Sequence, residues 1–188
     1  MKTVMIDVDL TLVDTLSPWL RWFKARTGIE LEANTYELST QMAKYMIHEC
    51  PMSYWREKGV YEGLIPYPAS TYTVRKLVDS GFRVVFVTWS PYPDQIAPKE
   101  QWLTKHYGND IPVIHTEHKH LIDADIMIDD NPKMLSEFLA AKSGRVALKY
   151  DTRLNQNWSA PYGQKSLTIR SWDSVQEYFT NYQGVQFK

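Results

Sequence analysis

Two aspartates separated by one residue follow the first apolar segment of the chain. Residues 4–8 are rich in β-branched side chains, which is typical of a buried strand, and Asp7 and Asp9 lie at its end. In an extended chain, residues two apart point to the same side, so both carboxylates should lie together at the carboxyl edge of a sheet. Such carboxylates repel unless a cation compensates them or one is protonated, and both conditions suit phosphoryl transfer. Solvated aspartates at a strand end are the non-catalytic alternative.

A second acidic pair follows a later apolar segment. Residues 126–128 lead into Asp129 and Asp130, and Asn131 and Pro132 then have the character of a helix start. In a parallel sheet the carboxyl ends of the strands share one edge, where ligands bind, so the two acidic pairs can converge on one hard cation. Oxygen ligands of this kind suit magnesium, which keeps water molecules and takes one or two carboxylates together with a substrate phosphate.

Hydroxyl and ammonium groups that could hold a phosphate occur between the two acidic pairs. The apolar segment 84–87 ends in Thr88, Trp89 and Ser90, and the Thr88 hydroxyl could donate to a phosphoryl oxygen. Lys119 could neutralise charge that develops on a transferring phosphoryl group. Each signal is weak alone, because threonine and serine are ordinary residues of turns and helix caps, and a loop lysine is usually solvated.

The segments that would position these residues alternate between strand and helix patterns. Strands alternating with helices of about a dozen residues indicate right-handed βαβ crossovers, so we predict an α/β, Rossmann-like fold with a parallel sheet covered by helices on both faces. The predicted strands are residues 4–8, 83–88, 111–115, 126–128 and 145–148, and the predicted helices are residues 69–80, 99–107 and 132–141. The tail should add a loop at 151–164, a short strand at 167–169 and a helix at 172–182.

The connection between the first two strands is much longer than the others. About 70 residues separate Asp9 from the second strand, far more than one crossover helix needs. Residues 18–27 and 36–50 have the apolar spacing of helices, and Pro66 and Pro68 could mark a hinge. We therefore predict a small helical cap at residues 17–66, inserted after the first strand into a core formed by residues 1–16 and 67–188.

The composition restricts the partners and the location. The 188 residues include 21 Lys and Arg against 22 Asp and Glu, which gives no reason to expect a nucleic-acid polymer or an anionic membrane as a partner. Acidic residues interrupt the N-terminus before a long apolar run develops, and Cys50 is the only cysteine, so we expect a cytoplasmic protein without an intramolecular disulfide. No base partner for Cys50 is identifiable, so we expect it to be a small buried hydrophobe. His118 and His120 could share one side of the chain, but no third ligand for zinc is evident.

The combined motifs resemble those of a known superfamily. Asp-x-Asp-x-Thr-Leu after the first strand, a strand that ends in threonine, a later lysine and Asp-Asp after another strand resemble, in order, the four motifs of the haloacid dehalogenase superfamily. Within it, the pattern resembles the cytosolic and mitochondrial 5'(3')-deoxyribonucleotidases over roughly residues 2–132. Residues 52–55, 63–68, 88–91, 98–108 and 115–132 carry this similarity.

The resemblance implies a magnesium-dependent phosphomonoester hydrolase. Asp7 would attack phosphorus and form an aspartyl-phosphate, and Asp9 would protonate the leaving oxygen and then activate the water that releases phosphate. Magnesium would be held by Asp7, by the backbone carbonyl of Asp9 and by Asp130, with Asp129 in support.

The resemblance also implies which residues bind the phosphate, and the sequence departs from the family at a few positions. Leu10 replaces the glycine that is common after the second aspartate, and Glu117 occupies a place that is basic in the mammalian members. Trp89 is inserted where the nucleotidases tend to have threonine followed directly by Ser-Pro. The candidate phosphate ligands are Thr88, Trp89, Ser90 and Lys119.

The cap would select the substrate. The candidates for stacking on a nucleobase are Trp19, Phe23, Tyr36 and Trp55, although such aromatic side chains equally pack a cap against a core. Nucleoside monophosphates, deoxyribonucleotides first, are the expected substrates, and the assembly could be a homodimer. A general small-metabolite phosphatase would share every motif but not the base pocket. A non-catalytic nucleotide-binding module is a further alternative, which the presence of all four motifs disfavours.

Overall fold

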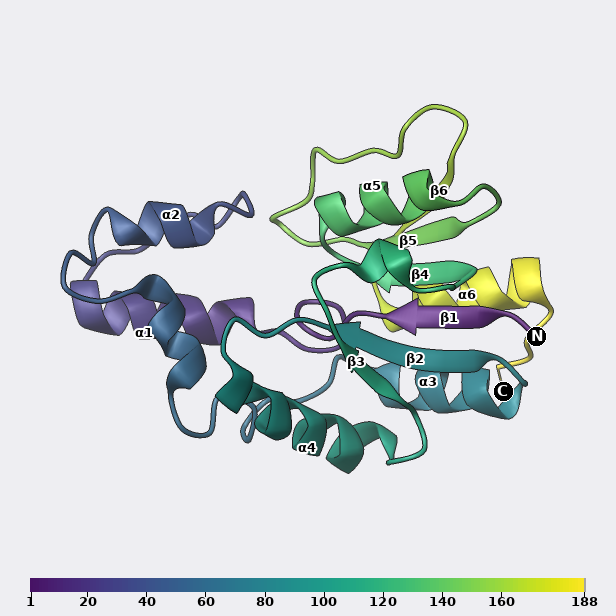
Figure 1. Cartoon of the computed structure of the whole chain (residues 1–188), viewed down its shortest axis with the longest axis horizontal. Helices are drawn as coiled ribbons and strands as arrows, with labels where there is room; N and C mark the ends of the chain where they lie inside the picture. The colour runs from purple at the N-terminus through teal and green to yellow at the C-terminus, as the bar shows by residue number, and fades with distance from the viewer. Residues whose placement is uncertain (188) are drawn as a thin grey trace.

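The computed structural model describes residues 1–187, whose six strands form one parallel sheet. The strand order is β3-β2-β1-β4-β5-β6, so β1 lies near the middle with β2 and β4 on either side (Figure 1). The strands are β1 (Thr3–Ile6), β2 (Arg83–Thr88), β3 (Val113–His115), β4 (Ile126–Asp129), β5 (Val146–Tyr150) and β6 (Lys165–Ile169). The predicted α/β class is confirmed.

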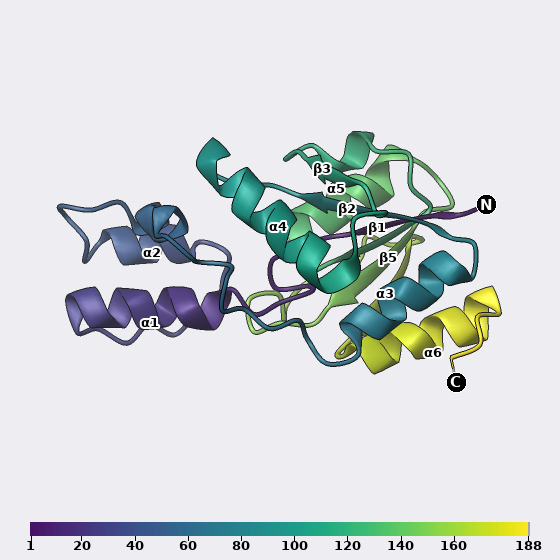
Figure 2. The same ribbon diagram turned by 90° about the horizontal axis from the view of Figure 1, so that it is seen from below.

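Helices cover both faces of the sheet, and alternate residues of β1 point to opposite faces. Val4 and Ile6 pack in the larger apolar cluster, which also contains Trp172, whereas Met5 packs in a second cluster with Phe138. Helices α3 (Ser70–Asp79), α4 (Ile96–Tyr107) and α6 (Trp172–Gln183) contribute to the larger cluster, and α5 (Pro132–Ala141) contributes to the second. Helices α3 and α6 lie side by side (Figure 2).

Strand β1 ends two residues earlier than predicted because the chain turns sharply after it. The Leu12 amide donates to the Val8 carbonyl at 2.8 Å, and Leu10 adopts a left-handed conformation with φ of 61°. The indole N–H of Trp172 in α6 donates to the Thr11 carbonyl at 3.0 Å. The last helix of the chain therefore holds the loop that follows the first strand.

Helices α1 (Leu16–Thr27) and α2 (Leu38–Ala43) lie beyond the end of the sheet to which the strands point, in contact with the 3-10 helix η1 (Pro51–Arg56) (Figure 1). They enclose an apolar cluster of their own, the cap cluster, which contains Leu16, Phe23, Ala33, Leu38, Met42 and Met46. The chain passes between these helices and the sheet twice. The two connecting segments lie side by side and form an isolated β-bridge between Val13 and Pro66. The division into cap and core at residues 17 and 66 stays a prediction.

The helix predicted at residues 36–50 is much shorter in the structure. The chain leaves α2 in turns, and Cys50 adopts extended backbone because a residue that precedes proline is sterically kept out of the helical region. Cys50 is also exposed, so the expectation that it is buried was wrong. The short 3-10 helices η2 (Pro93–Gln95) and η3 (Lys119–Leu121) complete the elements.

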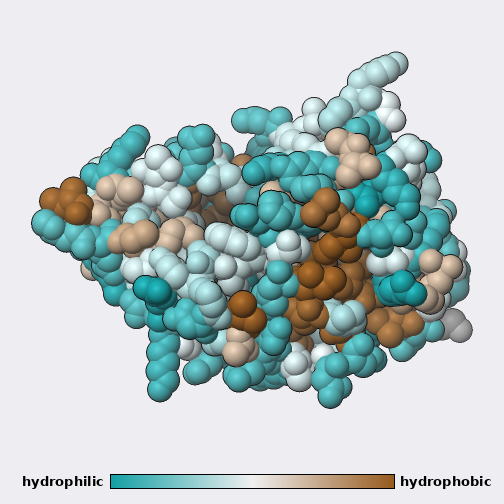
Figure 3. Space-filling model, in the orientation of Figure 1, coloured by the Kyte–Doolittle hydropathy of each residue, from teal (hydrophilic) through white to brown (hydrophobic). Residues whose placement is uncertain are grey.

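The tail follows the predicted order of loop, strand and helix, since residues 151–164 form turns and irregular backbone before β6 and α6. Among residues 1–187, no helix is long and apolar enough to span a membrane. Figure 3 shows hydrophobic side chains gathered over the side of the sheet that carries β2 and β3. Ile114 of β3 is 38% exposed, so this edge of the sheet is less well covered than its centre.

Candidate active site

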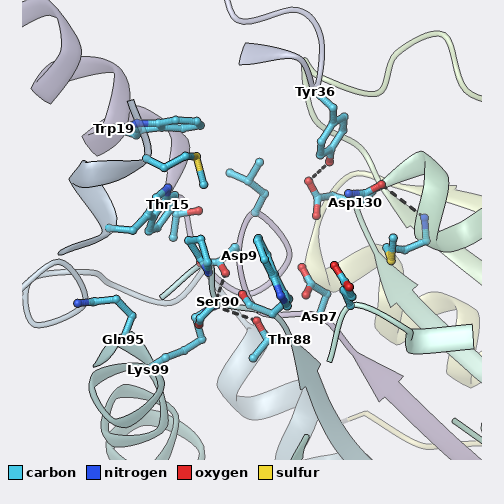
Figure 4. Close-up of a pocket in the computed structure, with 18 of the residues that line it drawn as sticks. Asp7, Asp9, Thr15, Trp19, Tyr36, Thr88, Ser90, Gln95, Lys99 and Asp130 are labelled. Atoms are coloured by element: carbon cyan, nitrogen blue, oxygen red, sulfur yellow. Dashed lines mark hydrogen bonds and ion pairs between the residues drawn. The ribbon is translucent and has the colours of Figure 1, made fainter. Parts of the chain in front are cut away.

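A cavity of about 450 Å³ lies at the carboxyl end of the sheet, where the strands face α1 and η1 (Figure 4). The strand register creates this convergence: Ile6 pairs with Phe86 on one side and with Ile128 on the other, so the residues that follow these strands emerge side by side. The predicted site residues that line the cavity are Asp7, Asp9, Trp19, Tyr36, Trp55, Thr88, Trp89, Ser90, Lys119 and Asp130.

Three buried carboxylates and one ammonium group form the centre of the site. Asp7, Asp129 and Asp130 each offer a carboxylate oxygen, and these oxygens lie within 4.8 Å of one another. Lys119, the first residue of η3, donates from Nζ to Asp7 Oδ1 at 2.5 Å and to Asp129 Oδ2 at 2.7 Å. We call Asp7, Asp129 and Asp130 the carboxylate cluster.

The carboxylate cluster holds more negative charge than Lys119 can balance. Burial raises the pKa of Asp7 to about 7, with Lys119 opposing the shift and the charge of Asp129 adding to it. Burial, followed by the charges of Asp129 and Asp7, raises the pKa of Asp130 well above its usual range. Burial disfavours the charged form of Lys119, but the two carboxylates that it contacts outweigh this and raise its pKa. An all-oxygen donor set with excess negative charge fits a hard divalent cation such as magnesium.

Asp9 lies in a different environment from Asp7. Its Oδ2 accepts from Lys99 Nζ at 2.7 Å, and its Oδ1 accepts from the Tyr61 hydroxyl at 2.8 Å. Lys99 and Tyr61 are buried, whereas the Asp9 side chain is 27% exposed. Burial, and then the charge of Asp9, raises the pKa of Tyr61 well above its usual range, so its hydroxyl is the donor. The two aspartates thus have separate partners and can take separate roles.

Lys99 is a site residue that sequence reasoning missed. Besides Asp9, its Nζ contacts Thr88 Oγ1 at 3.0 Å and the Trp89 carbonyl at 2.9 Å. Lys99 precedes the buried Trp102 and Leu103 of α4 by three and four residues, so it lies on the face of the helix that packs inward. A lysine within the apolar face of an amphipathic helix is the signal that could have identified it.

The candidate phosphate ligands at the end of β2 remain available for a substrate. Thr88 is fully buried, and because its hydroxyl oxygen accepts from Lys99, its own proton can still be donated to a phosphoryl oxygen. The Ser90 hydroxyl is buried, and within the described part of the chain it has no hydrogen-bond partner. Trp89 is 48% exposed and lines the cavity.

Three of the four predicted aromatic side chains line the cavity. The ring centroids of Trp19 and Trp55 lie 5.8 Å apart, and the Tyr36 hydroxyl donates to the Asp130 carboxylate (Figure 4). The prediction for Phe23 was wrong. Its side chain is fully buried in the cap cluster, where it fills the space between the cap helices and is not exposed to a ligand.

The tail of the chain supports Asp130, which follows β4. Asn155 is 2% exposed, and its Nδ2 donates to the Asp130 carbonyl at 2.7 Å and to the Tyr150 carbonyl at 2.8 Å. The sequence placed Asn155 in a loop without a role. A single asparagine in a polar loop carries no signal that distinguishes it from its neighbours.

All three positions that depart from the pattern of the resembled family line the cavity, namely Leu10, Trp89 and Glu117. Leu10 has a left-handed φ, which glycine would adopt without strain. Its side chain is half-buried and packs against the cap cluster, so it connects the loop after β1 to the cap helices.

Comparison with known proteins identifies the family. The model of the family described as "5' nucleotidase, deoxy (Pyrimidine), cytosolic type C protein" matches residues 1–178. The chain belongs to this family. A mouse mitochondrial 5'(3')-deoxyribonucleotidase is 30% identical over 141 residues, which cover 69% of this chain and 64% of the relative. A Bacillus subtilis 5'(3')-deoxyribonucleotidase is 24% identical over 178 residues, covering 93% and 96% of the two chains.

Solved structures that carry other names show the same fold. A haloacid dehalogenase family hydrolase from Deinococcus radiodurans, with bound phosphate and sodium, aligns with a TM-score of 0.63 at 13% identity, covering 100% of this chain and 99% of that chain. The predicted haloacid dehalogenase fold and the prediction of a phosphomonoester hydrolase of the nucleotidase type are confirmed.

Proposed function

We propose that this protein is a magnesium-dependent 5'(3')-deoxyribonucleotidase that hydrolyses nucleoside monophosphates through a phosphoaspartate on Asp7. The observation that carries the proposal is the separation of the two aspartates: Asp7 belongs to the carboxylate cluster, whereas Asp9 is held by Lys99 and Tyr61. The family and the relatives named above support the nucleotide class of substrate.

Two members of the carboxylate cluster and one backbone carbonyl would supply the metal ligands. Asp7, Asp130 and the backbone carbonyl of Asp9 would hold magnesium, while Asp129 keeps Lys119 beside them through its 2.7 Å contact. When bound, the ion neutralises the like charges that otherwise separate an anionic nucleophile from an anionic phosphate.

The two aspartates divide the reaction into two steps. In the first, a carboxylate oxygen of Asp7 attacks phosphorus, the bond from phosphorus to the nucleoside oxygen breaks, and Asp9 gives a proton to that oxygen. In the second, Asp9 takes a proton from a water molecule, which attacks phosphorus and breaks the bond to Asp7. Phosphate leaves, and both side chains return to their starting states.

The remaining lining residues hold the substrate. Thr88, Ser90 and Lys119 would contact the phosphoryl oxygens, and Trp19 and Trp55 would stack on the base. A cavity of about 450 Å³ is within the range of small-molecule sites. The cytoplasmic location and the homodimer expected from the sequence remain predictions.

Phosphate release from a panel of 5' and 3' nucleoside monophosphates and sugar phosphates, each with magnesium, tests the proposed substrate class. We expect deoxyribonucleoside monophosphates to give the highest kcat/KM, because the cap aromatic side chains can bind a base. Equal slow turnover of every compound would favour the general small-metabolite phosphatase instead. Nucleotide binding without any turnover would indicate the non-catalytic module.

The nucleophile is tested by Asp7→Asn, which should abolish turnover because an amide is a poor nucleophile. Circular dichroism and the unfolding temperature should show a retained fold. Asp123→Asn is the matched control, since the Asp123 side chain is 84% exposed and pairs with Lys142 outside the site. Full activity of the Asp7→Asn protein would refute the phosphoaspartate mechanism.

A further inference from the structure

Tyr61 lies on the segment that returns from the cap to the core, between η1 and α3, and its hydroxyl reaches a proposed catalytic aspartate. The side chain is 2% exposed and lines the cavity. The hydroxyl donates to Asp9 Oδ1 at 2.8 Å. The centroid of the ring lies 5.5 Å from Lys99 Nζ, so the tyrosine and the lysine enclose the same carboxylate.

The two oxygens of the Asp9 carboxylate are held from different parts of the chain. Lys99 of α4 contacts Oδ2 and is fixed in turn to the end of β2 through Thr88 and the Trp89 carbonyl. Tyr61, on the segment that returns from the cap to the core, contacts Oδ1. The terminal torsion of an aspartate has a broad energy minimum, so a contact to one oxygen leaves the carboxylate plane free to turn. A donor on each oxygen fixes that plane.

We propose that Tyr61 is a positioning residue whose hydroxyl sets the orientation from which Asp9 protonates the leaving nucleoside oxygen. This role rests on the proposed function, because it requires Asp9 to be the acid. Tyr61 keeps its own proton throughout, and the proton on the leaving oxygen comes from Asp9. Tyr61→Phe would keep the apolar wall of the cavity and remove only the contact to Asp9.

Leaving groups that differ in their need for a proton test this role. Deoxythymidine 5'-monophosphate releases an alcohol that must be protonated, whereas p-nitrophenyl phosphate releases a stable phenolate. The ratio kcat/KM reports the steps up to release of the leaving group, so it isolates the step in which Asp9 donates. We expect Tyr61→Phe to lower kcat/KM by about 10-fold for the nucleotide and by less than about 2-fold for p-nitrophenyl phosphate.

Tyr107→Phe is the matched control. It removes the hydroxyl of another buried tyrosine, whose oxygen lies 2.9 Å from Ser70 Oγ in the larger apolar cluster, away from the cavity. We expect it to leave both kcat/KM values unchanged. In the Asp9→Asn background, Tyr61→Phe should not change the ratio of kcat/KM for the nucleotide to kcat/KM for p-nitrophenyl phosphate. The side chain at position 9, through which Tyr61 acts, can then no longer donate a proton.

The outcomes separate this role from the proposed function. If the unmodified protein hydrolyses both substrates and Tyr61→Phe lowers the two values equally, or lowers neither, the positioning role is refuted and the proposed function stands. If the unmodified protein hydrolyses neither substrate, the proposed function is refuted and the role falls with it.

Discussion

Asp7 and Asp130 bind protons more readily than ordinary aspartates, because both are buried beside other carboxylates. A carboxyl group with a raised pKa stabilises the folded state at low pH and loses that contribution as the pH rises through the folded-state value. For Asp7 this window extends from 3.8 to about 7. Without a bound metal ion, repulsion between the carboxylates of the site is therefore greatest above neutral pH.

A pH-dependent effect of magnesium on stability follows. Protons and magnesium compete for the same oxygens, so we expect magnesium to raise the unfolding temperature more at about pH 8 than at about pH 5. Differential scanning fluorimetry at the two values measures this, with sodium chloride of equal ionic strength as the control. An equal shift at both pH values would contradict the raised pKa values of Asp7 and Asp130.

Leu10 combines a favourable side-chain contact with an unfavourable backbone conformation. The left-handed conformation costs a leucine about 1–2 kcal/mol, and burying half of its side chain against the cap cluster returns roughly 1 kcal/mol. Leu10→Gly loses the contact but also the strain, whereas Leu10→Ala loses the contact and keeps the strain. We therefore expect the glycine variant to be more stable than the alanine variant.

Leu20 provides the control for this order. It is half-buried against the same cap cluster, but it lies within α1, where glycine is about 1 kcal/mol less favourable than alanine. Chemical denaturation of the four variants should show opposite orders at the two positions. The same order at both would mean that the conformation of Leu10 carries no strain.

At the scale of the elements, the sequence predicts most of the site residues that the sheet positions. Short apolar segments that lead into Asp7, Thr88 and Asp129 identify a parallel sheet and its ligand-binding edge, because parallel strands bring their carboxyl ends together. The groups that hold these residues are less predictable. Tyr61 and Asn155 acquire their roles from contacts across the fold, and neither stands in a pattern that marks it.

The loop before β6 should contribute measurably to stability through Asn155. Asn155→Ala would leave two buried carbonyl groups without a donor, which costs about 1–3 kcal/mol for each unsatisfied group. We expect a lower unfolding free energy in chemical denaturation, and weaker magnesium binding because Asp130 loses its support. Asn157→Ala, at an exposed position of the same loop, is the control and should change neither quantity. An unchanged unfolding free energy of the Asn155→Ala protein would show that this loop connects β5 to β6 without stabilising the fold.

At the scale of the whole molecule, chemistry and selection come from different parts of the chain. Strand ends supply the carboxylates, and α1 and η1 supply aromatic side chains that face them across the cavity. The short α2 and the inward placement of Phe23 show why the cap is harder to predict. Helix α2 has only 6 residues, and most of the apolar residues of α1 and α2 pack against one another.

This division predicts a selective effect of Trp19→Leu. Loss of one stacking surface should lower kcat/KM about 10-fold for deoxythymidine 5'-monophosphate and leave deoxyribose 5-phosphate, which has no base, nearly unchanged. Trp22→Leu is the control from the same helix, because its indole contacts Glu57 and Arg26 and does not line the cavity in the described structure. An equal effect on both substrates would mean that Trp19 only packs the cap.

The contact between Trp172 and Thr11 joins two segments that lie 161 residues apart in the sequence, which bears on the order of events during protein synthesis. Strand β1 leaves the ribosome before its neighbours β2 and β4 and before the helix that holds its loop. The growing polypeptide carries Asp7 from the start but has no pocket around it. We therefore expect enzyme activity to begin only once α6 has emerged from the ribosome.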